Sequence, residues 1–99
     1  MDALSASSGE LRDALAEIPA PAEMFARLAR APDAATRRAA AENPNTPPAS
    51  LVALAADPIR YVRRAVAAHP NTPPATLERL LGDEDESVRE AAARTRAAF

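Results

Sequence analysis

The segment NPNTPPASL at residues 43–51 returns almost unchanged as HPNTPPATL at residues 69–77, 26 positions further along the chain. In each copy, one proline precedes a short polar stretch and a proline pair follows it. Proline disfavours helical geometry in the residue before it and fits well in the first turn of a helix. The segment is therefore typical of a corner between two helices. A fixed period of roughly 20–50 residues indicates a repeat protein whose neighbouring units stack on one another.

The helix before the second corner carries clear start and end signals. We expect Asp57 to be its N-cap and Pro58 to take its first position, where a missing N–H has no consequence. We expect Pro70 to end it. Residues at helical spacing predict one apolar face, formed by Ile59, Val62, Val66 and His69.

The helix after the corner is predicted to be short and partly 3₁₀. We expect Thr72 to cap it, Pro73 and Pro74 to occupy its first turn, and Gly82 to close it. Its apolar edge is formed by Leu77, Leu80 and Leu81.

Alignment on the period divides the chain into a lead-in at 1–9, an N-terminal repeat at 10–30, and repeats at 31–56, 57–82 and 83–99. A single repeat would expose an apolar face that only stacking buries. The sequence therefore predicts one all-α domain, a short α-solenoid of about three to four two-helix repeats. Its core stripes are Thr36, Val62 and Val88; Phe25, Leu51 and Leu77; and Leu28, Leu54 and Leu80.

The two ends of the chain differ from the repeats between them. Residues 7–10 (SSGE) predict a capping box that opens the first helix. Arg96 stands where the period places Pro70, so the last helix is expected to run to Phe99. The acidic run 83–86 is expected in its first turn, where it favours the helix dipole.

Composition narrows the range of functions. The net charge is −2, and all 12 basic residues are arginine, so the overall charge disfavours non-specific nucleic-acid binding. Cysteine is absent, which excludes thiolate catalysis and cysteine-ligated metals within this chain. We find no membrane span and no signal peptide, and expect a cytoplasmic location. We expect no cofactor.

Residues 62–74 (VRRAVAAHPNTPP), followed by Leu77 and Leu80, resemble the leucine-rich repeat variant family. The resemblance covers about residues 11–99 and implies a right-handed superhelix of alternating α- and 3₁₀-helices. The chain departs from the family pattern where Ala31 replaces an aspartate and Thr36 replaces a valine. Some members carry a cysteine-ligated iron–sulfur cluster, which this chain has no residues to hold.

Three arginines recur at one register: Arg37, Arg63 and Arg89. They could form a basic stripe for phosphate or an acidic partner. We favour a structural brace to Asp57, Asp83 and neighbouring carbonyls, because the guanidinium fork suits such bonds and the aspartates recur at the same spacing. Asp57 with Arg63, and Asp83 with Arg89, also resemble the Asp and Arg that brace HEAT repeats.

A second set of residues is the candidate partner-binding patch. On a helical wheel, Arg64 points away from the apolar face, and exposed Tyr and Arg are enriched in interface hot spots. An ordinary solvated face is the alternative, because Glu90 replaces the arginine in the third repeat. The candidates are Arg38, Arg60, Tyr61, Arg64 and Arg79.

The sequence predicts a non-enzymatic module that binds a protein or peptide through exposed helix faces. Phosphate-backbone binding through the arginines, as in HEAT-like solenoids, is the alternative. His69 is the only histidine and lacks the partners of a catalytic or metal site, and the run 83–86 lacks the pattern of a calcium loop, so we expect no metal. End-to-end stacking of copies, with Phe99 contributing, is a further option.

Overall fold

A computed structural model describes residues 20–99 of the chain. Over this range it contains six α-helices and no strand. The predicted capping box at residues 7–10, and the lead-in and N-terminal repeat as far as residue 19, lie outside the described residues. The helices are α2 (Pro21–Leu28), α3 (Ala34–Glu42), α4 (Pro48–Leu54), α5 (Arg60–Ala68), α6 (Pro74–Leu80) and α7 (Glu86–Ala97).

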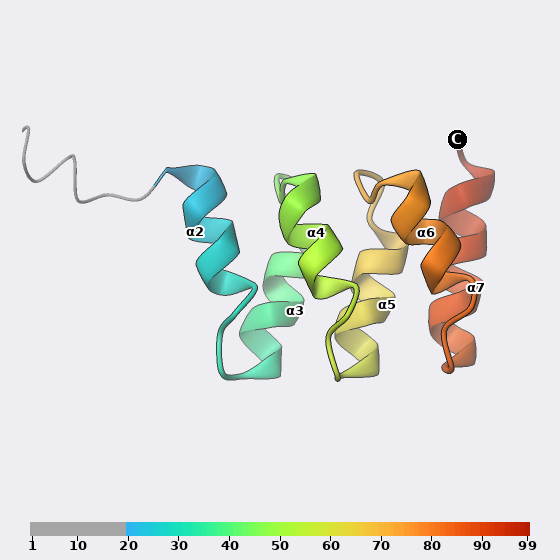
Figure 1. Ribbon diagram of the computed structural model, residues 1–99, viewed down its shortest axis with the longest axis horizontal. Helices are drawn as coiled ribbons and strands as arrows, with labels where there is room; N and C mark the ends of the chain where they lie inside the picture. The colour runs from blue at the N-terminus through green and yellow to red at the C-terminus, as the bar shows by residue number, and fades with distance from the viewer. Residues whose placement is uncertain (1–19) are drawn as a thin grey trace, which may run out of the picture.

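The helices alternate between two parallel rows (Figure 1). One row holds α2, α4 and α6, and the other holds α3, α5 and α7. Within the second row, α5 packs against α3 on one side and against α7 on the other. The predicted all-α solenoid of stacked two-helix repeats is confirmed.

The core lies between the rows and includes six of the nine residues of the predicted stripes. Leu51, Leu54, Leu77 and Leu80 come from the short helices, and Val62, Val66 and Val88 from the long ones; all are almost fully buried. Alanines fill the remaining space and allow close helix packing. Burial of each large side chain stabilises the fold by about 1.5–3 kcal/mol. Phe25, Leu28 and Thr36, from the first stripe positions, are only half-buried.

The corner between the helices is held by its threonine, but not in the predicted way. α6 begins at Pro74 with Pro73 as N-cap, and no side chain caps it. The Thr72 hydroxyl instead points back and donates to the Val66 carbonyl at 2.7 Å. Thr46 makes the same bond to Ala40 in the preceding corner. The Val66 carbonyl also accepts from the His69 N–H at 3.0 Å, so the hydroxyl is a second donor to this carbonyl near the helix end and links the corner to the helix.

The long helices begin later than predicted, so the expectation that Asp57 is an N-cap was wrong. α5 begins at Arg60, with Ile59 as N-cap, and the Asp57 carboxylate accepts from the Ile59 N–H at 2.9 Å. The positions equivalent to Ile59 are Asp33 and Asp85, which do cap α3 and α7. Hydrogen bonds from the Thr36 hydroxyl and backbone lower the pKa of Asp33, and those from Ser87 and Val88 do the same for Asp85.

Two further expectations about helix ends need correction. Glu86 alone of the run 83–86 falls within the first turn of α7, because Asp85 is the cap and Asp83 lies before it. α6 ends at Leu80 with Leu81 as C-cap, and Gly82 has no positive φ, so it does not close the helix as a left-handed glycine. A Gly82 N–H bond to the Arg79 carbonyl gives this end a 3₁₀-type turn, although α4 and α6 are themselves α-helical. Phe99 lies beyond the end of α7 and is 70% exposed.

Candidate functional site

The recurring arginines join one repeat to the next. Arg37 Nε lies 2.7 Å from Asp57 Oδ2, and Arg63 Nε lies 2.8 Å from Asp83 Oδ2. In both pairs a second guanidinium nitrogen reaches the other carboxylate oxygen, at 3.4 and 3.1 Å. The side-chain pair therefore spans 20 residues and crosses the boundary between repeats.

The third guanidinium nitrogen bonds within the arginine's own repeat. Arg63 Nη1 donates to the Asp57 carbonyl at 2.8 Å, and Arg37 Nη1 donates to the Ala31 carbonyl, also at 2.8 Å. Arg89 keeps this bond, to the Asp83 carbonyl at 2.7 Å, but makes no ion pair with a carboxylate within residues 20–99. Ala31 can serve in the first repeat because only its backbone is used.

The side chains of these pairs are largely shielded from solvent. The side chains of Arg63 and Asp83 are 10% and 9% exposed. Burial alone would raise the pKa of Asp83, but hydrogen bonds from Arg63 and from the Asp85 N–H, with the arginine charge, lower it. The hydrogen bond to Asp83 raises the pKa of Arg63. The fork of Arg63 is thus occupied, and so is that of Arg37, which leaves them poorly suited to a basic stripe that contacts a partner.

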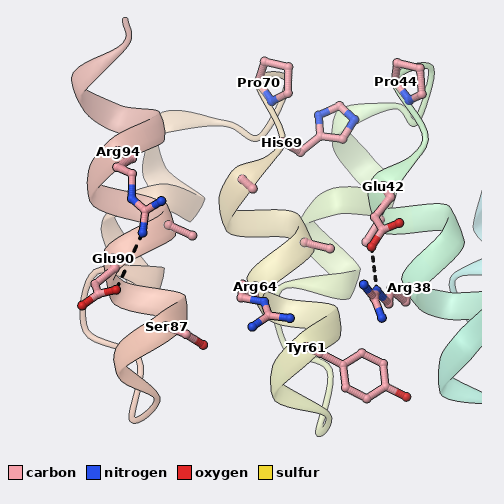
Figure 2. Close-up of a pocket in the computed structure, with 14 residues that line it drawn as sticks. Arg38, Glu42, Pro44, Tyr61, Arg64, His69, Pro70, Ser87, Glu90 and Arg94 are labelled. Carbon is pink, nitrogen blue, oxygen red and sulfur yellow. Dashed lines mark hydrogen bonds and ion pairs between the residues drawn. The ribbon is translucent and has the colours of Figure 1, made fainter.

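A groove of about 550 Å³ lies across α3, α5 and α7. Its lining comes from these three helices and from the turns that follow α3 and α5. Four lining side chains are alanines, which leave the space open: Ala41, Ala65, Ala68 and Ala91. Figure 2 shows the larger groups around it, with Arg64 between charged residues of α3 and of α7.

Three of the five predicted contact residues meet in this groove: Arg38, Tyr61 and Arg64. The Arg38 guanidinium carbon lies 5.5 Å from the centroid of the Tyr61 ring, a cation–π contact. Arg38 Nε also lies 2.6 Å from Glu42 Oε1. Arg64 makes no hydrogen bond or ion pair with any side chain of residues 20–99 and is exposed.

The other two candidates lie elsewhere. Arg60 Nη1 lies 3.7 Å from Asp85 Oδ2, in a second depression that Tyr61 also lines. Arg79 is on α6, in the other row of helices. The ionisable residues of the groove that sequence reasoning left out of the contact patch are Glu42, His69, Glu90 and Arg94. Register alignment could have found Glu42 and Arg94, because both stand at the position of Ala68 in α5.

His69 is a buried structural link. Its Nε2 lies 2.7 Å from the Asn43 carbonyl in the preceding repeat, and its Nδ1 accepts from the Asn71 N–H at 3.0 Å. Nε2 therefore carries the proton and donates. Asn43 makes the equivalent local bond, its Oδ1 accepting from the Asn45 N–H. Histidine thus keeps the turn made by asparagine and adds a bond between repeats.

Residues 20–99 contain no cluster of three or more His, Cys, Asp or Glu side chains able to hold a metal ion. None of the six helices is long and apolar enough to cross a membrane.

Two rows of short helices, repeated every 26 residues and linked by arginine–aspartate pairs between repeats 31–56, 57–82 and 83–99, define a helical-repeat protein. The model of one such family, the leucine rich repeat variant, matches two consecutive repeats at residues 34–59 and 60–85. The chain belongs to this family, as its sequence motif predicted. No curated protein and no solved structure matches it. The family is a structural repeat rather than a catalytic domain.

Proposed function

We propose that this chain is a non-catalytic interaction module that binds a segment of another protein in the groove across α3, α5 and α7. The observation that carries the proposal is the combination of four alanines with Tyr61 and an exposed Arg64 in the lining of one groove. Sites of about 300–1,000 Å³ accommodate specific ligands, and Tyr and Arg dominate interface hot spots.

The groove is suited to recognition because core packing and ion pairs hold its walls in place. The helices that form it are fixed by the buried valines beneath them and by the pairs Arg37–Asp57 and Arg63–Asp83. A preorganised site loses little conformational entropy when a ligand binds. Small side chains along the floor allow the backbone of an extended segment to approach closely.

Phosphate-backbone binding is the weaker candidate for this surface. Two of its three arginines, Arg38 and Arg94, are already paired with Glu42 and Glu90. These glutamates would repel a chain of phosphates, and the net charge of −2 gives no long-range attraction.

The test is selection of peptides from a phage-displayed random dodecapeptide library on the 99-residue chain. Ala68 is exposed and lines the groove, so Ala68→Trp fills the groove without disturbing the core. Ala75→Trp on α6 places the same side chain on an exposed site in the other row and is the matched control. We expect selected peptides to lose binding to the first variant and keep it with the second. Peptides that bind both variants equally would place the binding surface elsewhere.

A further inference from the structure

Among the described residues 20–99, Arg64 is the one charged side chain of the groove without an ion-pair partner, and the repeat register shows how this arises. The same i,i+4 pair of positions is filled by Arg38 and Glu42 on α3, by Arg64 and Ala68 on α5, and by Glu90 and Arg94 on α7. The outer two repeats form internal ion pairs, with N–O distances of 2.6 and 3.7 Å. In the middle repeat an alanine replaces the carboxylate, so Arg64 has no partner on its own helix.

The position of Arg64 makes this charge important for binding. Arg64 lies between the two ion pairs, at the centre of the groove (Figure 2). A ligand that covers the groove removes water from the guanidinium. Desolvation of an unpaired charge is strongly unfavourable, whereas a carboxylate that pairs with it forms short, charge-assisted bonds. An occupant without an acid opposite Arg64 would therefore bind poorly.

The flanking glutamates limit the acid to one. Glu42 on α3 and Glu90 on α7 both line the groove, on either side of Arg64. A ligand with negative charges in succession would place them against these carboxylates, and like charges at an interface cost affinity. The charge pattern of the groove thus complements a single acidic residue flanked by neutral ones.

We propose that the groove binds an extended peptide segment in which one Asp or Glu pairs with Arg64 and small neutral residues cover the alanines. This assignment rests on the proposed peptide-binding function and names the chemistry of its partner.

The experiment uses the missing i+4 carboxylate. Ala68→Glu gives Arg64 the internal partner that Arg38 already has in Glu42. Ala68→Gln has the same size without the charge and is the control. Glu42 occupies the equivalent last position of α3, so this site in the fold accepts a glutamate. Circular dichroism checks that both variants are folded.

Peptides selected on the wild-type chain are then titrated by fluorescence polarisation. We expect them to share one acidic residue and to bind Ala68→Glu about 10- to 150-fold more weakly than Ala68→Gln, the range for loss of a charge-assisted hydrogen bond. Replacing that acid in the peptide by its amide should weaken binding to the wild type by a similar factor. The same replacement should have little further effect on binding to Ala68→Glu.

Three results would overturn the assignment. If the peptides share no acidic residue, or bind Ala68→Glu and Ala68→Gln equally, Arg64 does not recognise an acid. Peptide binding in the groove would still stand. If no selected peptide is blocked by Ala68→Trp, the proposed function fails and the assignment fails with it. If a mixed-sequence single-stranded oligonucleotide binds in an Arg64-dependent way and no peptide is recovered, the groove recognises phosphate instead.

Discussion

Replacement of Arg63 by methionine tests how the repeats are held together. Arg63→Met keeps the apolar stem of the side chain and removes the guanidinium. The change breaks two bonds to Asp83, at 2.8 and 3.1 Å, and one to the Asp57 carbonyl, at 2.8 Å. Asp83 stays buried with only the Asp85 N–H, at 2.9 Å, as a remaining partner.

The expected loss follows from that geometry. Removing one partner of a buried ion pair costs about 3–5 kcal/mol, and the retained N–H bond favours the lower end of this range. A loss of about 3 kcal/mol corresponds to a fall in melting temperature of roughly 12–24 °C for a domain of this size. The assay is thermal and urea denaturation followed by circular dichroism at neutral pH.

Arg89→Met is the matched control within the chain. Arg89 occupies the same register but makes only the carbonyl bond, so its replacement should cost about 1 kcal/mol. If the two variants lose equal stability, the pairing between Arg63 and Asp83 contributes nothing beyond the carbonyl bond. An unchanged melting temperature in Arg63→Met would refute the brace altogether.

The same pair has a pH signature. In the wild type, the pKa of Asp83 lies below its unfolded value, because the bonds from Arg63 and the Asp85 N–H outweigh burial. The contribution of Asp83 to the free energy of unfolding is therefore present above about pH 4 and is lost as the pH falls through the lowered pKa. In Arg63→Met, the guanidinium no longer offsets the burial of the Asp83 carboxylate. Protonation of Asp83 removes this charge and therefore reduces the loss of stability in the variant. We expect the stability difference between wild type and variant to narrow below about pH 4; a constant difference would contradict this account.

Three further substitutions have definite expectations. Leu77→Ala should lose about 2–5 kcal/mol by urea denaturation, because Leu77 is fully buried between the rows; a loss under about 1 kcal/mol would mean that the core is not packed there. His69→Asn should keep the local turn that Asn43 makes in its own repeat but lose the bond to the Asn43 carbonyl. We expect the free energy of unfolding to fall by about 1 kcal/mol. Equal urea midpoints for the wild type and the variant would argue against that bond between repeats. Arg64→Glu should change stability by less than about 0.5 kcal/mol while abolishing peptide binding, so a large fall in melting temperature would give Arg64 a structural role.

The sequence by itself determined the repeat, its helices and the residues they bury. The 26-residue period, the prolines at the corners and the spacing of Val62, Val66, Leu77 and Leu80 are local features. A helix turns every 3.6 residues wherever it lies, so its apolar face is readable without knowledge of its neighbours. Family membership followed from the same residues.

Details of the corners escaped this reasoning because two structures competed for the same residues. Asp57 has the chemistry of an N-cap, but its carboxylate pairs with Arg37 from the preceding repeat, and the helix starts at Arg60 instead. Thr72 lies between α5 and α6, and its hydroxyl donates to the Val66 carbonyl of α5 instead of capping α6. A local sequence pattern does not determine which of two neighbouring groups a polar side chain will bond.

Only the tertiary structure decided which residues of different repeats meet. The rotation and offset between stacked helices place Arg63 against Asp83 of the next repeat. They also bring Arg38 and Tyr61 together, while Arg60 lies outside the groove and Arg79 lies in the other row of helices. These distances depend on how side chains pack between helices, which no single repeat encodes. The central position of Arg64 in the groove, and with it the proposed partner, follows from that packing.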